Sequence, residues 1–452
     1  MRKKIVIVGF GNIGQGVVPL LKQHFQDKSI IAVDKDTDQA RMQLAAAWSM
    51  QLIQCKVAAE NFEASLGPLL NPGDFLLNLA PSVSSRDLIG LTQRIGALYL
   101  DTGIEPWEYA PSDSDVDTSN AALRNTILSA KQHASGSSTA VVAHGANPGF
   151  VSVLVKRALI AMASVSACAR WDGVTPTSRL EWATLASALD IRVIQISEYD
   201  TQRSAEAPRQ GDFVNTWSVP GFVEECLQDA ELGWGTHEHT LPSFVRQRNH
   251  PPGASIQLAR AGCETHVKSW SPLQGEFDAY LLSHNESISI ADYLTLGEPS
   301  SATYRPTVYY AYRPIDAALA SLAALRAHDG AVVMRERVLK DELHDGADEL
   351  GVLLMSGTGQ SLWLGSALTL QRARSLAAHN NATSLQVVSS VLAAMQWACA
   401  HPERGIVESE ELDYDELFQF ARHYWEPIRE ASTQWAPAGS AGELQFSAFL
   451  IE

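Results

Sequence analysis

The stretch Ile5-Val6-Ile7-Val8-Gly9-Phe10-Gly11-Asn12-Ile13-Gly14 decides the fold of this chain, because an apolar run enters a turn with glycines at the spacing GxGxxG. Gly9 allows the chain to turn sharply off a buried strand, and Gly11 allows backbone N–H groups to approach a pyrophosphate. Gly14 allows the next helix, expected over residues 13–23, to pack on the strand and direct its N-terminal amides at the phosphates. The stretch predicts a dinucleotide-binding site, although a glycine turn without a ligand can have the same spacing.

A second apolar run, over residues 30–33, ends at Asp34, twenty residues after Gly14. A carboxylate at this position accepts hydrogen bonds from the ribose hydroxyls and repels a 2′-phosphate, so NAD is predicted rather than NADP. The nearby Lys35 and Arg41 could weaken that discrimination. Strand, glycine turn, helix, strand and acid in this order are much more specific than the glycine spacing alone.

Two later apolar strands, expected over residues 74–80 and 97–101, also end in polar residues. Doubly wound folds bind their ligands at the carboxyl ends of the strands. The predicted cofactor site therefore consists of Gly9, Gly11, Asn12, Ile13, Gly14, Asp34, Asn78, Pro81, Ser82, Asp101 and Thr102.

The predicted fold class is α/β, with a Rossmann-type doubly wound parallel sheet in residues 1–148 and a second α+β domain in residues 149–452. Part of the C-terminal region could pack back on the first domain. Residues 408–424 are acidic and amphipathic, which is typical of a helix that faces solvent or another subunit. In the second domain we expect strands over 192–197, 279–283 and 307–313, a hairpin of 352–356 with 361–367, and a helix over 384–400.

Composition and charge narrow the class of protein. The chain has 452 residues, enough for two domains, and 34 basic against 51 acidic residues give a net charge of −17. This charge disfavours nucleic acid and anionic membranes as partners, and it would attract a cationic small molecule. The five cysteines are odd in number and form no CxxC pair, which is typical of a reducing cytoplasm. We therefore expect a cytoplasmic protein with no membrane or nucleic-acid partner.

Polar clusters beyond the first domain are rich in carboxylates and tryptophans rather than arginines, which favours a cationic substrate. An ammonium group is bound by Glu or Asp and by an aromatic face, whereas a carboxylate usually needs a bidentate Arg. Trp107, Trp217 and Trp234 are the aromatic candidates, although core packing is the commoner role of any single Trp. The acidic candidates are Glu105, Glu198, Glu225, Glu231 and Glu286.

Histidines at positions 237 and 239 could share one face of a strand as metal ligands. No third ligand follows at a recognisable spacing, so no metal is predicted. His144 and His284 lie in loops near the predicted site, and each could equally be a buried structural histidine.

Six separated motifs resemble the bacterial homospermidine synthases, within the saccharopine dehydrogenase-like group. They are Asp101-Thr102-Gly103-Ile104-Glu105-Pro106-Trp107, His144-Gly145-Ala146-Asn147-Pro148-Gly149, Asn215-Thr216-Trp217-Ser218-Val219, Glu231-Leu232-Gly233-Trp234-Gly235-Thr236-His237-Glu238, His284-Asn285-Glu286-Ser287-Ile288-Ser289 and Tyr304-Arg305-Pro306-Thr307. The resemblance extends from the glycine turn to about residue 315. Two residues depart from it, since Gly103 replaces an expected Cys and Pro220 an expected Glu.

The resemblance implies an NAD-dependent transfer without net oxidation. One putrescine is oxidised to an imine, a second displaces ammonia, and the retained NADH reduces the new imine to homospermidine. The implied catalytic residues are Trp217, which would stabilise the iminium by its π face, Glu198 and His284, which could move protons, and Asn147, which would orient the nicotinamide or the imine nitrogen. Substrate binding is assigned to Glu105, Glu225, Glu286 and Trp234. Spermidine or diaminopropane are further candidate substrates, and a homodimer formed through the sheet of the second domain is expected.

Two alternatives remain at this point. A saccharopine-type dehydrogenase would act on amino acids and needs arginines near the site, for which Arg203, Arg246, Arg248 and Arg305 are the candidates. A non-enzymatic NAD sensor would use the same glycine turn, but it would not explain the polar and aromatic motifs outside the first domain.

Overall fold

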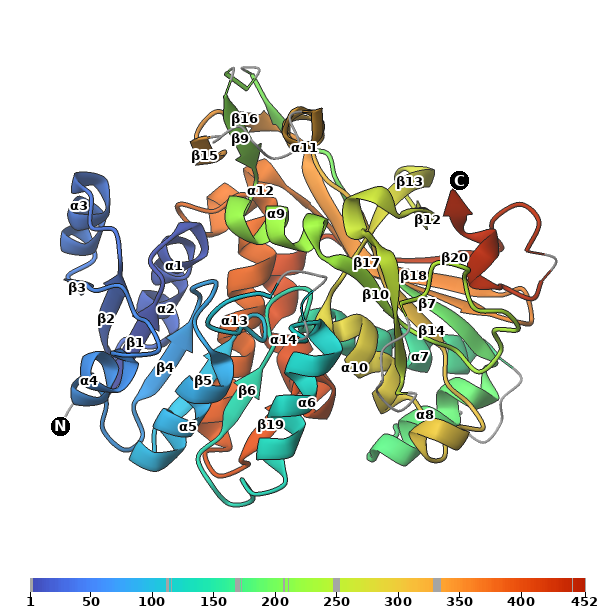
Figure 1. The fold of residues 1–452 in the computed structure, drawn as a ribbon, viewed down its shortest axis with the longest axis horizontal. Coiled ribbons are helices and arrows are strands. Elements are labelled where there is room, and N and C mark those ends of the chain that lie inside the picture. The colour runs from blue at the N-terminus through green and yellow to red at the C-terminus, as the bar shows by residue number, and fades with distance from the viewer. Residues whose placement is uncertain are drawn as a thin grey trace.

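The computed structural model in Figure 1 describes most of the chain. The described residues are 3–110, 114, 116–166, 171, 173–205, 208–209, 211–246, 253–327, 335–440 and 442–451. Within them, no helix combines the length and apolar character needed to cross a membrane. Four of the cysteines are free thiols, whereas Cys168 lies outside the described residues.

The first sheet is parallel and has the strand order β19-β6-β5-β4-β1-β2-β3. Its strands are β1 (Lys4–Val8), β2 (Ser29–Asp34), β3 (Gln51–Gln54), β4 (Phe75–Asn78), β5 (Leu98–Asp101), β6 (Ala140–Val142) and β19 (Ile406–Glu408). The helices that connect the first six strands are α1 (Asn12–Gly16), α2 (Val18–His24), α3 (Gln39–Ala47), α4 (Phe62–Leu66), α5 (Ser85–Ile95) and α6 (Asn120–Lys131). The order of β1 to β6 is that of a doubly wound dinucleotide fold, which confirms the predicted fold class.

The helix expected over residues 13–23 is divided in two. Helix α1 ends at Gly16, and α2 begins at Val18 with Pro19 in its first turn. Proline is favoured at the start of a helix because its missing N–H is not needed there. The prediction of one continuous helix is therefore wrong.

The second sheet is mixed and larger, with the order β20-β18-β17-β7-β14-β13-β12-β21 and the pair β10–β11 attached. Its strands are β7 (Ile191–Asp200), β10 (Asp229–Gly233), β11 (Ser255–Ala261), β12 (His266–Ser271), β13 (Gly275–Leu282), β14 (Thr307–Arg313), β17 (Ala347–Ser356), β18 (Ser361–Thr369), β20 (Ile428–Thr433) and β21 (Leu450–Ile451). Only β7 and β14 pair in parallel along this path. Two small separate sheets are formed by the short strands, β9 (Asp212–Asn215) with β15 (Arg335–Val338) and β8 (Arg203–Ser204) with β16 (Leu343–Asp345).

Helices of the second half lie between and around the two sheets (Figure 1). They are α7 (Phe150–Val165), α8 (Arg179–Ala188), α9 (Val219–Leu227), α10 (Asn285–Tyr293), α11 (Asp316–Ala327), α12 (Leu370–Leu376), α13 (Ala382–Ala400) and α14 (Tyr414–Trp425). Helix α13 contacts α1, α2 and β5 of the first domain and β17 of the second. Strand β19 pairs with β6, so a segment near the C-terminus completes the first sheet. The domain boundary at residue 148 stays a prediction.

Helix α14 is amphipathic and exposes its polar side chains, as the acidic segment predicted, but it is shorter than that segment. The segment first forms β19 and a short 3-10 turn, Ser409–Glu411, and the helix begins only at Tyr414. Its apolar face packs on α7, where the rings of Phe150 and Trp425 lie 4.5 Å apart. The amphipathic pattern of the segment reflects packing against the protein interior.

Candidate active site

A groove of about 770 Å³ runs along the carboxyl ends of β1 and β2. Gly9 has φ +92°, and a Cβ there would lie 2.8 Å from the backbone nitrogen of Ala80. A Cβ on Gly14 would overlap the carbonyl oxygen of Gly9, whereas one on Gly11 would meet open space. These three positions fit the close approach of a dinucleotide to the backbone.

Asp34 lines the groove at the end of β2, where a ribose is expected. Its carboxylate accepts hydrogen bonds from the backbone N–H groups of Phe10 and Asp36. Arg41 lies 3.5 Å from an Asp34 oxygen and donates to the Asp36 carbonyl at 3.0 Å, so its charge is already partly engaged. This arrangement fits a ribose with free hydroxyls better than one with a 2′-phosphate.

A second, smaller cavity of about 190 Å³ adjoins the groove. Both cavities have Ile13, Trp217 and Ser218 among their lining residues, so they lie next to each other. Four glutamates line the smaller cavity, and none of its described lining residues is a lysine or arginine. We call this cavity the reaction pocket; its glutamates are Glu105, Glu198, Glu224 and Glu225.

Glu198 projects from β7 and is buried at the inner end of the reaction pocket. One of its oxygens accepts hydrogen bonds from the Asn147 side-chain amide at 3.1 Å and from the Tyr310 hydroxyl at 2.6 Å. Burial raises the pKa of Glu198 to about 7. A carboxyl that changes its charge near neutral pH can accept and return a proton.

His284 lies between two carboxylates at the N-terminus of α10. Its Nε2 is 3.1 Å from a Glu225 oxygen, and its Nδ1 is 3.1 Å from a Glu286 oxygen. Burial lowers the pKa of His284, but the two carboxylates outweigh it and hold that pKa well above its usual range. Glu286 is buried and does not line the reaction pocket. It therefore holds His284 in place, which differs from the substrate contact predicted for it.

Glu105 and Glu224 also line the reaction pocket. Glu105 accepts hydrogen bonds from the Ser82 backbone at 3.0 Å and the Tyr109 hydroxyl at 3.1 Å. Burial raises its pKa to about 7. Burial, followed by the negative charges of Glu105 and Glu225, raises the pKa of Glu224 to about 8. Like charges crowded in this way favour binding of a cation.

Glu224 was not among the predicted site residues. It lies on α9, directly before Glu225, and it lines both the groove and the reaction pocket. The charged pair was visible in the sequence, but an α9 helix that presents both carboxylates to one cavity was not.

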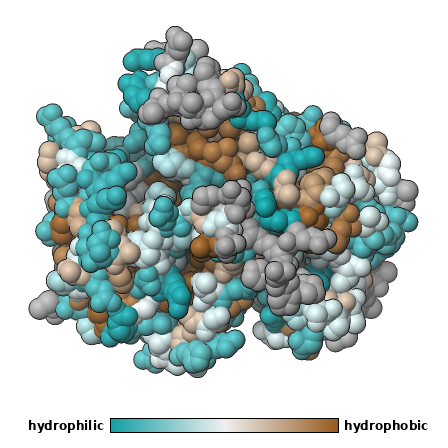
Figure 2. Space-filling view, in the orientation of Figure 1, coloured by the Kyte–Doolittle hydropathy of each residue, from teal (hydrophilic) through white to brown (hydrophobic). Residues whose placement is uncertain are grey.

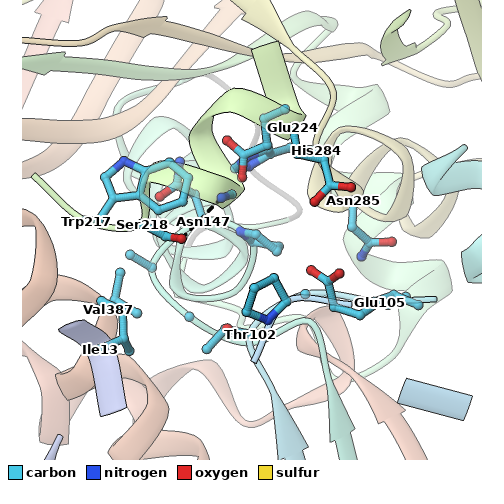
Figure 3. Close-up of a pocket in the computed structure, with 18 of the residues that line it drawn as sticks. Ile13, Thr102, Glu105, Asn147, Trp217, Ser218, Glu224, His284, Asn285 and Val387 are labelled. Carbon is cyan, nitrogen blue, oxygen red and sulfur yellow. Dashed lines mark hydrogen bonds and ion pairs between the residues drawn. The ribbon is translucent and has the colours of Figure 1, made fainter. Parts of the chain in front are cut away.

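Trp217 stands on one side of the reaction pocket, and Glu105 and Asn285 stand on the opposite side (Figure 3). Its ring contacts Phe222 edge-on, with the centroids 6.2 Å apart. Ser218 begins α9 by accepting a hydrogen bond from the Gly221 backbone, which fixes the turn that carries Trp217. Hydrophobic residues gather over α9 on the outer face of the molecule (Figure 2). A half-buried indole at this position can cover a cation in the pocket.

Three predicted residues lie elsewhere. Trp234 lines neither cavity and packs on Phe446, with ring centroids 6.0 Å apart, so its role is in the core. Glu231 accepts hydrogen bonds from the Asn120 backbone and the Ser283 hydroxyl and is likewise structural. Asp101 is buried behind the pocket and accepts a hydrogen bond from the Ala143 backbone at 2.6 Å, which supports the loop after β6.

The remaining predicted cofactor residues line one or both cavities. Asn78 and Thr102 line the reaction pocket, Asn12 and Ser82 line the groove, and Pro81 lines both. The two departures from the family pattern also lie here. Gly103 lines the reaction pocket and Pro220 the groove.

The arginines that a carboxylate substrate would need are engaged elsewhere. Arg203 pairs with Asp345 at 2.6 Å, and Arg246 hydrogen-bonds Asp229 at 2.5 Å. Arg305 donates to backbone carbonyls at 3.0 and 3.2 Å. None of these three lines the reaction pocket, and Arg248 lies outside the described residues. The site therefore disfavours the saccharopine-type alternative.

Comparison with known proteins places both halves in one family. Residues 5–142 match the family described as the saccharopine dehydrogenase NADP binding domain, and residues 145–432 match the saccharopine dehydrogenase C-terminal domain. A homospermidine synthase of Blastochloris viridis is 44% identical over 449 residues, which cover 97% of this chain and 93% of the relative. A homospermidine synthase of Mesorhizobium japonicum is 40% identical over 444 residues, covering 96% and 91%.

One solved structure agrees with these relatives. The crystal structure of a homospermidine synthase from Legionella pneumophila in complex with NAD is 35% identical, with a TM-score of 0.90. The match covers 100% of this chain and 98% of that one. The resemblance found in the six motifs is thereby confirmed, and the chain belongs to the homospermidine synthase family.

Proposed function

We propose that this chain is an NAD-dependent homospermidine synthase that joins two putrescine molecules and releases one ammonia. The observation that carries the proposal is a reaction pocket lined by four glutamates and a tryptophan, next to a dinucleotide groove. A diamine has an ammonium group at each end, and both carboxylates and an aromatic face bind ammonium groups. The names of the relatives and the NAD bound in the Legionella structure support the same proposal.

The groove fits NAD because Gly11 leaves open space beside the backbone for the pyrophosphate, and because the Asp34 carboxylate lines the groove where the ribose is expected. When bound, NAD supplies the hydride chemistry: it takes a hydride from an amine carbon and returns it to the new imine carbon. The other atoms balance without an external oxidant, because two diamines give one triamine and one ammonia. The site residues then have to move protons, bind ammonium groups and exclude water.

Glu198 is proposed as the proton carrier. A protonated amine is a poor hydride donor, so the reacting nitrogen must first lose a proton. The buried carboxylate of Glu198 is the inner acid of the pocket, and Asn147 and Tyr310 fix one of its oxygens. Its other oxygen remains for the reacting nitrogen. Asn147 holds the Glu198 carboxylate through its hydrogen bond and also orients the reacting nitrogen of the amine.

Trp217 and His284 are proposed to act on the positive charge that develops. The π face of Trp217 stabilises the iminium and keeps water from hydrolysing it. The imidazolium of His284, held between Glu225 and Glu286, keeps those two carboxylates from repelling each other. His284 can pass a proton through Glu225 to the leaving amine nitrogen. This proton transfer assists the departure of ammonia.

The first experiment is to incubate the purified protein with NAD and putrescine and to analyse amines and ammonia by mass spectrometry. We expect homospermidine and ammonia in equal amounts, without a matching increase of free NADH absorbance. Accumulation of NADH without a triamine would indicate an ordinary amine dehydrogenase.

We also expect a cytoplasmic homodimer, and light scattering after size-exclusion chromatography tests the dimer.

Cofactor choice gives a prediction for Asp34. We expect Asp34→Ala to raise the NAD concentration needed for half-maximal activity about tenfold, since the ribose loses a charge-assisted hydrogen bond. Discrimination against NADP should fall at the same time. Titration of each dinucleotide against the intrinsic fluorescence of the protein measures both. Unchanged NAD affinity with unchanged preference would remove Asp34 from the cofactor site.

Glu224 gives a prediction for the incoming amine. Among the described residues, no hydrogen bond or ion pair engages its carboxylate, in contrast to Glu105, Glu198 and Glu225. We propose that it binds the distal ammonium of the second diamine. Glu224→Gln should then raise the KM for putrescine about tenfold, the size of one charge-assisted contact, with a smaller change in kcat.

A comparison of acceptors isolates this role. 1-Aminobutane has no distal ammonium, so the Glu224→Gln enzyme should lose its preference for putrescine over 1-aminobutane as acceptor. Glu224→Asp, which keeps the charge, should retain part of that preference. An unchanged preference in Glu224→Gln would contradict the assignment.

A further inference from the structure

The second wall of the dinucleotide groove comes from the second domain. The glycine turn and Asp34 form one wall, and Trp217, Pro220, Arg337 and Lys340 contribute to the other. The segment from Arg337 to Lys340 begins in β15, which pairs in parallel with β9. A dinucleotide in this groove would lie between the two domains, so its release depends on how firmly the walls are joined.

One side-chain contact crosses the groove directly. The Lys340 ammonium donates to the Gln15 side-chain oxygen at 3.0 Å. Gln15 in turn donates from its amide nitrogen to the carbonyl of Phe10 at 2.9 Å, within the glycine turn itself. Arg374 donates to the Lys340 carbonyl at 2.8 Å and so supports the backbone on the second-domain side. The second domain is thus linked through two side chains to the loop that receives the phosphates.

A buried contact holds the same helix at the next residue, Gly16. Asn380, which precedes α13, donates to the carbonyl of Gly16 at 2.9 Å and is 4% exposed. A Cβ on Gly16 would lie 2.6 Å from the Asn380 side-chain oxygen. Helix α1 therefore cannot shift away from the second domain without breaking a buried hydrogen bond. Asn380 thus holds α1 in place, and the contact between Lys340 and Gln15 joins the second domain to this fixed helix.

We propose that Lys340 and Gln15 form a latch that closes the groove over the bound dinucleotide and slows its dissociation. The two are positioning residues, and Lys340 acts through Gln15 on the glycine turn. This inference rests on the proposed function, in which the reduced cofactor must stay bound while the amines exchange. A dehydrogenase that releases its cofactor after each turnover has no need for such a contact.

The test is the dissociation rate of NADH from the full-length protein. Bound NADH is displaced by excess NAD in a stopped-flow fluorimeter, and the decay of its fluorescence is followed. We expect Lys340→Met to release NADH about tenfold faster than the wild type, the size of one hydrogen bond to a charged group. Lys22→Met is the matched control, because Lys22 carries the same charge on α2 of the first domain and lines neither the groove nor the reaction pocket. Its release rate should not change.

A double-mutant cycle separates the latch from a simple charge effect. If Lys340 acts through Gln15, the double variant of Gln15→Leu and Lys340→Met should release NADH no faster than the faster single variant. Fully additive effects, or an unchanged rate in Lys340→Met, would overturn the latch. Failure of the wild-type protein to bind NADH at all would contradict the proposed function instead, so the two failures are distinct.

Discussion

Glu198→Gln should lower kcat about a thousandfold, within the range that a positioned general base contributes to catalysis. The variant removes only the ability to take up a proton, since the amide oxygen can still accept hydrogen bonds from Asn147 and Tyr310. The thermal unfolding temperature should therefore change little. Steady-state turnover with putrescine, together with a melting curve, measures both effects. Turnover within a few fold of the wild type would exclude Glu198 as the proton carrier.

The same residue predicts the pH dependence. Burial raises the pKa of Glu198 to about 7, and only its charged form can accept a proton. The kcat of the wild type should therefore rise as the pH increases through about 7 and fall as the pH decreases below it. The residual activity of Glu198→Gln should lack this rise. A conservative change at an exposed glutamate, Glu60→Gln, should leave the profile as it is.

Trp217→Ala should lower turnover about thirtyfold, which corresponds to the ~2 kcal/mol of a desolvated cation–π contact. The loss should appear mainly in kcat, because the iminium carries a fixed charge that the free amine lacks. The ring is only partly buried beside the cavity, so stability should be affected less than activity. Trp217→Phe keeps an aromatic face and should recover much of the rate. Equal turnover in the alanine variant and the wild type would remove Trp217 from the mechanism.

The first domain could be predicted closely because its signals are local. Gly9, Gly14 and Asp34 each satisfy a backbone or ligand requirement that few other residues meet, and they occur in one short stretch. The three-residue strand β19 could not be found in this way. Strand β19 follows β6 in the chain by more than 260 residues, and it pairs with β6 because the chain returns to the first sheet. No local sequence pattern encodes that return.

The candidate site likewise contains residues that local motifs reveal and residues whose position depends on the whole fold. Glu198, Asn147 and His284 could be predicted because motifs at strand and helix ends carry them, and all three line the reaction pocket. Trp234 was misassigned because a tryptophan in a glycine-rich motif can equally pack in a core, which it does against Phe446. Glu224 was missed because its role depends on the way in which α9 faces the pocket.

The central claim is that the hydride removed from one putrescine returns to the same carbon. The most direct measurement uses putrescine that carries deuterium at both carbons next to nitrogen, incubated with the protein, NAD and a large excess of unlabelled NADH. If the reduced cofactor stays bound, mass spectrometry will show homospermidine that has kept every deuterium. If the cofactor exchanges during the reaction, the product will have lost one deuterium per molecule, and the retained-cofactor account will be wrong.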